Sequence, residues 1–566
     1  MATKEIQTTV GPLLGLGAAI TSLFLVTSGV SDPVNVTKMM VAGGLGIAGL
    51  LVFIIFGLKE SIVRFPAILV ATSLFLFASI NAVSFSKAPA AQNFYGTYGR
   101  NTGFLTYLFM IGIMLLALML SSEKNFTYLV LGLVGTGFVN VVYCAWVLTF
   151  GDFIGWSNPY GNILGLFGNP DFISAFLGMF ITSSLALVIS KEFSAWKRLS
   201  LVLLSAVALF EIVKSHAIQG LVVTAGGLVI IGFYFVRSRT SGWLIPSLYL
   251  AFSAVIAFSA VLGTLQKGPF SFVYKRSVSL RGSYWHAGID MGTQNPWHGV
   301  GFDTYGDWYR RSRPPVALVD MPGVNIMSNV SHNVVIDFFA SGGWPLLLTY
   351  IAILILGVRS ILKVTSEHRQ YNPIFVSIAA TWTCYQVQSL ISINQVGLTV
   401  WGWALTGALI SYEKFILQPP NLETLGQSNS RSIRNSSSNP ISPALVAAIG
   451  AAVGFFLAAP ALNAETTWQS ANQSRNLETV KKALNPTFMN PASSLKYAQA
   501  VDLLQRSNLL DLAHQYAVKG TAFNPDYFDG WKQLYYLPNT TTAEKNKALK
   551  NMIRLDPLNS DVTRVR

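Results

Sequence analysis

The short run Ser331-His332-Asn333 has clear catalytic potential in this sequence, because it places a histidine at the start of an apolar stretch. Ser331 can cap a helix that begins here, and His332 would then lie in the first helical turn. The positive end of the helix dipole disfavours the imidazolium form and lowers the pKa of His332. A neutral imidazole can act as a general base at pH 7, with Asn333 beside it. A histidine that only anchors the helix end is the alternative.

The preceding segment, residues 264–331, combines basic side chains with many aromatic ones. Guanidinium groups bind phosphate through paired hydrogen bonds, and aromatic faces cover the apolar faces of sugar rings. The segment therefore predicts a ligand with anionic and with carbohydrate or lipid character; a basic cap resting on anionic lipid headgroups is the alternative. Its candidate binding residues are Arg276, Arg281, Trp285, Tyr305 and Trp308, and further arginines are Arg310, Arg311 and Arg313.

Other candidate residues lie at the ends of apolar stretches. Arg100 is part of Tyr98-Gly-Arg-Asn-Thr-Gly103, and Asp171 follows the turn Gly168-Asn-Pro170. Lys214 and His216 end another stretch, and Glu211 is expected to form an ion pair with Lys214. We find no metal-ligand cluster, paired carboxylates or phosphate-binding glycine loop, so the sequence predicts neither a metal nor another cofactor.

These residues must be positioned by a membrane protein, because the composition excludes a water-soluble enzyme. Of the 566 residues, 52% are hydrophobic and only 11% are charged, against roughly 25% in soluble domains. The charged fraction is about 9% in residues 1–460 and about 21% in residues 461–566. The chain therefore predicts an all-α membrane domain followed by a small domain of soluble composition.

Apolar stretches of about the 20 residues that span a bilayer recur along the chain. We expect twelve spans and a separate thirteenth, at residues 10–30, 36–57, 63–84, 104–121, 126–150, 172–190, 199–215, 218–236, 242–263, 332–356, 373–393, 396–416 and 441–460. With a cytoplasmic N-terminus, fifteen Lys and Arg residues fall in cytoplasmic segments and four in short outer loops, as the positive-inside rule requires. Segment 264–331 and the C-terminal domain are then both extracytoplasmic.

The domain organisation follows from this pattern. Residues 1–416 form the main membrane domain, residues 417–440 a Ser-, Asn- and Pro-rich cytoplasmic linker, and residues 441–460 the extra helix. In residues 461–566, Asn485-Pro486, Asn524-Pro525 and Asp556-Pro557 recur at spacings of 39 and 32 residues. This spacing favours a degenerate tetratricopeptide-like helical repeat, with an unrelated helical cap as the alternative.

The motifs and their order resemble those of the O-antigen ligase superfamily over residues 10–416. The matching runs are Tyr98-Gly-Arg-Asn-Thr-Gly103, Gly168-Asn-Pro-Asp171, Arg281 with Trp285, Pro296-Trp-His-Gly-Val-Gly-Phe302 and Ser331-His-Asn333, with a long outer loop between the ninth and tenth spans. The chain departs from the family pattern at Leu346, where a glycine is usual, and at Ser215-His216, where Ser-Arg is usual.

The resemblance implies a metal-independent glycosyltransferase of the bacterial cytoplasmic membrane. Such an enzyme moves a glycan from a polyprenyl (undecaprenyl) diphosphate carrier to a hydroxyl of a glycolipid, polysaccharide or protein acceptor outside that membrane. In this interpretation Arg281 and Arg100 hold the diphosphate, with Lys214, His216 or Arg276 in support, His332 takes the acceptor proton, and Asn333 positions it.

Several interpretations stay open at the level of sequence. A polysaccharide polymerase or a protein O-oligosaccharyltransferase of the same superfamily would use the same carrier chemistry with a different acceptor. A lipid-linked glycan transporter is the alternative from a different class. Nucleic acid is not an expected partner, because positive charge in a membrane domain is usually an orientation signal.

Overall fold

The computed structural model describes residues 2–190, 193–264, 266–271, 276–320, 324, 327–417, 441–474 and 476–563, without the side chains of residues 2–4, 276–279, 320, 561 and 563. Every regular element in these residues is helical, and the only β pairing among them is an isolated bridge between Thr487 and Asn490. The all-α prediction is therefore confirmed. The predicted linker at residues 417–440 lies, beyond Leu417, outside the described residues.

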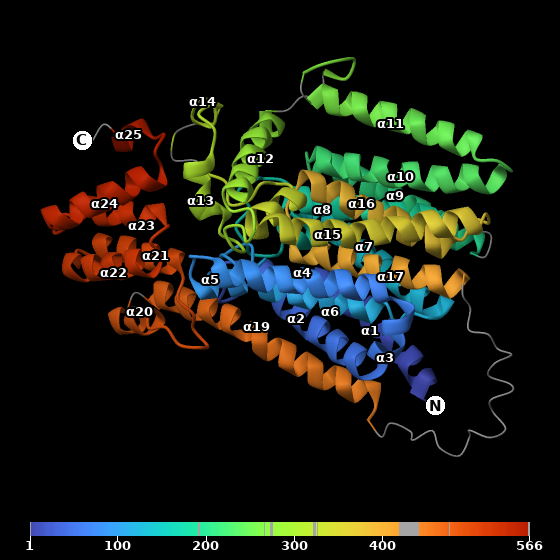
Figure 1. The fold of residues 1–566 in the computed structure, drawn as a ribbon, viewed down its shortest axis with the longest axis horizontal. Coiled ribbons are helices and arrows are strands. Elements are labelled where there is room, and N and C mark those ends of the chain that lie inside the picture. The colour runs from blue at the N-terminus through green and yellow to red at the C-terminus, as the bar shows by residue number, and fades with distance from the viewer. Residues whose placement is uncertain are drawn as a thin grey trace.

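Fifteen helical segments build a bundle in which long helices lie side by side (Figure 1). They are α1 (Ala2–Leu23), α2 (Asn35–Val52), η1 (Phe53–Gly57), α3 (Leu58–Arg64), α4 (Pro66–Phe85), α6 (Phe104–Ala117), α7 (Glu123–Phe150), α8 (Pro170–Val188), α9 (Ala195–Lys214), α10 (Ile218–Arg239), α11 (Leu244–Thr264), α15 (Val334–Glu367), α16 (Pro373–Ile391), α17 (Val396–Leu417) and α19 (Pro443–Ser474). Each of the thirteen predicted stretches overlaps one of the long helices.

Ten helices in the described part of the chain are long and apolar enough to cross a membrane, which supports a multi-pass membrane protein. Three of the thirteen predicted spans do not meet this standard. The helix α6 has only 14 residues, and α9 carries Lys197, Arg198, Glu211 and Lys214. Threonine, glycine and tryptophan residues lower the mean hydropathy of α17.

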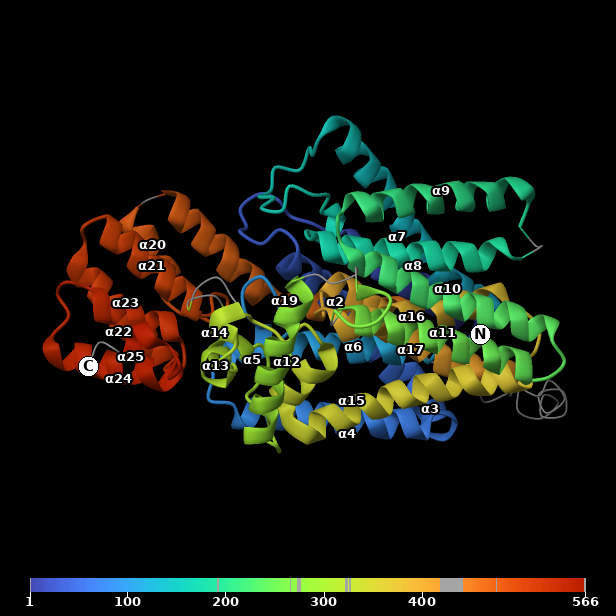
Figure 2. The same ribbon diagram turned by 90° about the horizontal axis from the view of Figure 1, so that it is seen from above.

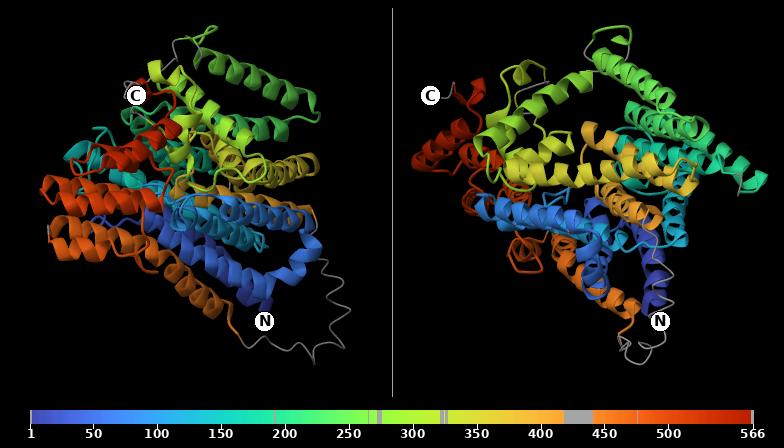
Figure 3. Two further views of the ribbon diagram at one scale, coloured as in Figure 1. Left: turned by 60° about the vertical axis from the view of Figure 1, so that its left-hand side comes forward. Right: turned by 45° about the vertical axis from the view of Figure 1, so that its right-hand side comes forward.

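Close backbone contact at glycine joins α6, α2 and α19. A Cβ atom at Gly112 of α6 would lie 2.0 Å from the carbonyl oxygen of Gly46 in α2, and one at Gly454 of α19 would lie 1.9 Å from that of Gly43. Small residues allow such close packing of membrane helices. The late helix α19 is thereby part of the bundle, whereas α11 is almost wholly exposed at its margin (Figure 3).

One end of the bundle carries the short elements that connect the long helices. They are α5 (Ala90–Tyr95), η2 (Gly165–Phe167), α12 (Arg276–Gln294), α13 (Tyr305–Ser312) and α14 (Ala317–Asp320). The C-terminal domain lies beyond α13 and α14 at this same end (Figure 2), and the N-terminus lies at the other end. The side of the membrane on which each end lies stays a prediction from the basic residues.

The C-terminal domain consists of helices packed around its own apolar core, which includes Trp468, Trp531 and Leu555. Its helices are α20 (Leu477–Ala483), α21 (Ser494–Arg506), α22 (Leu510–Phe523), α23 (Phe528–Tyr536), α24 (Thr542–Leu555) and α25 (Ser560–Thr563). Consecutive helices from α21 to α25 pack against each other, and α20 packs against α19. Asn524 and Asp556 follow the ends of α22 and α24. The tetratricopeptide assignment stays a prediction.

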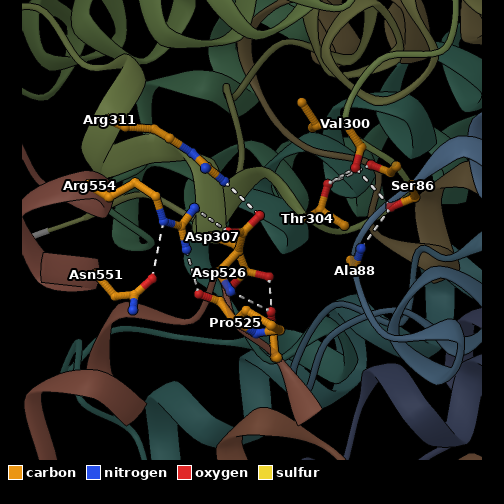
Figure 4. Close-up of polar contacts among 12 residues, drawn as sticks. Ser86, Ala88, Val300, Thr304, Asp307, Arg311, Pro525, Asp526, Asn551 and Arg554 are labelled. Atoms are coloured by element: carbon orange, nitrogen blue, oxygen red, sulfur yellow. Dashed lines mark hydrogen bonds and ion pairs between the residues drawn. The ribbon is translucent and has the colours of Figure 1, made fainter. Parts of the chain in front are cut away.

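Ion pairs dock this domain on α13 and the residue that follows it. The buried carboxylate of Asp556 pairs with Arg310 at 3.2 Å and with Arg313 at 2.7 Å. Arg311 reaches Asp526 at 3.0 Å, where Arg554 also converges (Figure 4). The sequence suggested phosphate binding for these loop arginines, but they form ion pairs with carboxylates of the C-terminal domain instead.

Candidate active site

Asp303 holds the loop that carries Arg100. Its carboxylate accepts hydrogen bonds from the backbone N–H groups of Thr97 and Thr102, at 2.9 and 3.1 Å, and from the Thr102 hydroxyl at 2.6 Å. A Cβ atom at Gly96 would lie only 2.3 Å from Asp303 Oδ2, so the glycine leaves room for this approach. The runs around Arg100 and around Phe302, some 200 residues apart in sequence, are thus parts of one structure.

A break in α15 at Gly343 fixes the segment before Asp303. Gly343 adopts φ +64°, and the N–H of Trp344 donates to the carbonyl of Pro296 at 2.8 Å. Val300 and Gly301 donate to backbone carbonyls of α15, and the Val300 carbonyl accepts from Ser86 and Thr304 (Figure 4). Leu346, at the position where the family has glycine, is fully buried one turn further on.

His332 lies just before α15 and not in its first turn, because Asn333 is the cap. Asn333 Oδ1 accepts from the N–H groups of Val335 and Ile336, and its amide donates to the Leu390 carbonyl at 3.0 Å. The cap expected at Ser331 is therefore wrong: the Ser331 hydroxyl donates to the Asn333 carbonyl at 2.8 Å, and the Ser331 N–H donates to Asp337 at 2.8 Å. His332 adopts φ +57°, and its ring lies 5.4 Å from that of Tyr284 in α12.

His332 lines a cavity of about 330 Å³ together with residues from five other segments of the chain, three of which carry charged or ionisable side chains of interest. Arg100 comes from the loop before α6, Asp171 from the start of α8, and His216 from the turn between α9 and α10. Arg100 also lines a smaller adjoining cavity with Asp303 and Asp337. The structure thus brings together three of the predicted site residues, Arg100, His216 and His332.

The electrostatics of this cavity keep His332 neutral. Burial, with the positive charges of Arg281 and Arg100, lowers the pKa of His332 from 6.5 to about 3. Burial also lowers the pKa values of Arg100 and Arg281, against nearby carboxylates that raise them. Neither guanidinium has a hydrogen bond or an ion pair within 4 Å to another described residue. Two half-buried cations without close partners among the described residues are suited to an anionic ligand.

The other predicted binding residues lie in different surroundings. Lys214 lies over the ring of Phe210, 5.5 Å from its centroid, and the expected pair with Glu211 is absent from the ion pairs of the described residues. Tyr305 is buried, and its hydroxyl donates to the Tyr284 carbonyl. Trp308 stacks on Arg311 at 3.6 Å and so belongs to the docking contact.

Trp285 and Arg276 complete this set. Trp285 is half-buried in α12, and its buried Nε1 has no hydrogen-bond partner among the described residues. The side chain of Arg276 lies outside the described part of the structure.

Sequence reasoning missed two residues that shape this site. Asp303 is not among the candidate residues of the sequence analysis, although it directly follows the run that ends at Phe302 and anchors the loop of Arg100. Tyr284 precedes Trp285 and contacts the imidazole of His332. No local pattern marks either role.

Unusual backbone conformations concentrate around the cavity. Four of the six non-glycine residues with positive φ in the described residues are Asn101, His216, Asp303 and His332. Such conformations cost energy and persist where the surrounding structure enforces them, typically at functional sites.

Comparison with known families gives one finding for this region. Residues 201–351 match the model of the family described as O-antigen ligase, a range that contains most of α9, α10 to α12, Arg281, His332 and the break at Gly343. This match confirms the resemblance to the O-antigen ligase superfamily over these residues. No curated protein matches the chain.

Proposed function

Because residues 201–351 match the O-antigen ligase family, whose members are membrane glycosyltransferases, we propose that this protein transfers a glycan from a polyprenyl diphosphate carrier to an acceptor hydroxyl. The proposed reaction takes place at the outer face of the bacterial cytoplasmic membrane. One observation carries the proposal: a single cavity collects His332, His216 and Arg100, with Arg281 close enough to influence the histidine.

The cationic side chains are assigned to the donor. Arg100 and Arg281 lack close carboxylate partners among the described residues, so the diphosphate of the donor would supply their negative counter-charge. His216 at the same cavity wall would contact the diphosphate or the first sugar. During transfer the leaving diphosphate gains negative charge, and the fixed guanidinium groups stabilise it.

His332 is assigned to the acceptor. An imidazole nitrogen takes the hydroxyl proton while the acceptor oxygen forms a bond to the anomeric carbon of the donor glycan. The bond between that carbon and the phosphate oxygen breaks, and the electron pair leaves with the carrier diphosphate. A histidine with a pKa of about 3 is a weak base, but the bound diphosphate would offset the charges of Arg281 and Arg100 and raise this pKa. Base catalysis would then depend on a bound donor.

Asn333 acts as a positioning residue in this scheme. Its side chain is committed to capping α15 and to the Leu390 carbonyl, which fixes the backbone that presents His332. Glycolipid, polysaccharide and protein acceptors are all compatible with this chemistry. A carrier-glycan transporter is the rival, and it would move the carrier without forming a glycosidic bond.

The test is transfer by the purified full-length protein in liposomes, with labelled polyprenyl-diphosphate glycan and a crude cell-envelope extract as acceptor source. We expect His332→Ala to lower transfer about a hundredfold or more while donor binding persists. We expect Arg281→Ala to weaken donor binding itself. His368→Ala and Arg239→Ala, exposed residues at the ends of α15 and α10, are the matched controls.

Two results would count against the proposal. Full activity of both site variants would show that the site is elsewhere. Donor binding without transfer, across extracts from several envelopes, would favour the transporter.

A further inference from the structure

A large groove separates the membrane bundle from the C-terminal domain, and the proposed function leaves it without a role. The groove has a volume of about 430 Å³, within the usual range for ligand pockets of about 300–1,000 Å³. Its walls come from α5 and the loop of Arg100, from α19, and from the start of α21. Both domains therefore contribute to one site, which their docking ion pairs hold together.

The deep end of this groove adjoins the candidate active site. Asp303 and Asn329 line both the groove and the small cavity that contains Arg100, and Arg100 in turn lines the cavity of His332. At this end Asn101 is only 5% exposed, and its side-chain oxygen has no hydrogen-bond partner among the described residues. A buried acceptor atom without a partner costs free energy, and a ligand hydroxyl would satisfy it.

The lining of the groove matches the chemistry of a carbohydrate. Four aromatic rings, those of Tyr95, Tyr98, Trp468 and Tyr527, offer apolar faces. Amides and carboxylates offer partners for hydroxyl groups; Glu465 Oε1, for example, accepts from the Ser31 and Asp32 N–H groups while its other oxygen has no such bond in the described residues.

The charge of the residues that line the groove restricts the chemical class of the ligand further. The carboxylates of Asp303, Asp307, Glu465 and Asp529 face the groove together with one ammonium, that of Lys496. Burial raises the pKa of Glu465 to about 7, and Asp529 lies 3.9 Å from Arg310, but the remaining acidic side chains still disfavour an acceptor rich in phosphate or carboxylate. The described walls consist of helices and loops without a strand edge, so they do not offer the row of backbone hydrogen bonds that binds an extended peptide.

We propose that the groove between the two domains binds the acceptor, and that this acceptor is an uncharged oligosaccharide whose terminal hydroxyl passes Asn101 toward Arg100 and His332. The assignment of the bound oligosaccharide as the acceptor rests on the proposed transferase function, but the test of its binding is independent of transfer. The C-terminal domain thus completes the acceptor site, and the bundle alone holds the donor site.

The test measures saturable binding of labelled probes to the full-length protein in lipid nanodiscs. The neutral probes are tetrasaccharides of N-acetylglucosamine and of glucose, the anionic probe is tetragalacturonate, and the peptide probe is a decapeptide of lysine, serine and glycine. We expect a neutral tetrasaccharide to bind and tetragalacturonate not to bind. Tyr98→Ala, at a side chain that is 43% exposed, should weaken binding about fivefold to tenfold, and Asn101→Gly, which keeps the positive φ, should weaken it similarly.

Tyr536→Ala is the matched control, because this tyrosine is 62% exposed on the C-terminal domain but does not line the groove. Absence of binding by both neutral probes overturns the proposal, and so does binding that Tyr98→Ala and Asn101→Gly leave unchanged. Binding of the peptide in their place would identify a protein acceptor and also overturn it. If neutral glycans bind as expected but His332→Ala still transfers normally, the catalytic assignment fails and the groove assignment stands.

Discussion

The coupling between Arg281 and His332 can be measured directly by replacing the arginine with glutamine. Burial and two positive charges lower the pKa of His332 from 6.5 to about 3, which corresponds to about 5 kcal/mol against protonation. The larger of the two charge effects comes from Arg281. Arg281→Gln should therefore raise the pKa of His332, which should stay below 6.5 because burial is the largest cause.

The assay is nitrogen-15 NMR of the protein labelled at its six histidines, with the His332 signal assigned from His332→Gln. In the protein without donor, His332 should stay neutral to below pH 5. Inorganic pyrophosphate, which mimics the charge of the carrier, should raise the pKa of His332, and its effect should be smaller in Arg281→Gln.

The same displacement makes stability depend on pH. The folded pKa lies below the unfolded value of 6.5, so the unfolded chain takes up a proton that the folded protein does not as the pH falls from 6.5 toward 3. Between pH 7.5 and pH 5 this should cost about 2 kcal/mol, a loss that His332→Gln removes. A His332 pKa at or above 6.5 without donor, or one that Arg281→Gln leaves unchanged, would refute the reasoning.

Three further substitutions test the parts that position this site. Asp303→Asn weakens the carboxylate contacts that hold Thr97 and Thr102, so the affinity for the donor, measured by equilibrium binding, should fall about tenfold. Unchanged affinity would show that the loop does not need this anchor. Asp556→Ala removes the carboxylate that the buried guanidinium groups of Arg310 and Arg313 share, and it leaves Arg310 only the more distant Asp529 at 3.9 Å. It should weaken docking by about 3–5 kcal/mol, seen as faster limited proteolysis of the C-terminal domain. Asp502→Ala, at an exposed pair, should cost about 1 kcal/mol or less, and equal cleavage of both variants would contradict the docking role. Gly343→Ala adds a Cβ atom 2.3 Å from the Pro296 carbonyl oxygen at φ +64°. Gly151→Ala, at φ +86° with no atom within 4 Å, adds only backbone strain of roughly 1–2 kcal/mol. Gly343→Ala should therefore lower the unfolding temperature clearly more than Gly151→Ala, and equal losses would show that the contact with Pro296 does not matter.

The apolar helices were predictable because their signal is local. A run of about 20 apolar residues satisfies its backbone in a bilayer only as a helix, so composition and length alone locate it. All thirteen predicted stretches overlap helices, although only ten helices in the described residues meet the standard for a membrane span. The change in charge near residue 460 likewise marked the C-terminal domain, which has its own core.

Residue type also pointed to part of the site. A histidine at the start of an apolar stretch and an arginine beside a Gly-rich turn are unusual enough to be noticed one at a time. What the sequence could not give is their proximity: Arg100 and His332 line one cavity although 232 residues separate them. The helix cap at Asn333 also escaped prediction, because Ser331 and Asn333 are both good caps and only the backbone path chooses between them.

The sequence by itself determined a helical membrane protein, its long connecting segment 264–331 and the residues with catalytic potential, since composition and periodicity act within a few turns of chain. The tertiary structure alone decided which charges meet. Arg310 and Arg313 look like phosphate ligands in sequence, but Asp556, more than 240 residues away, forms ion pairs with both. Arg100 and Arg281 have no such partner among the described residues. An ion pair depends on a contact of a few ångströms that only the packed fold creates.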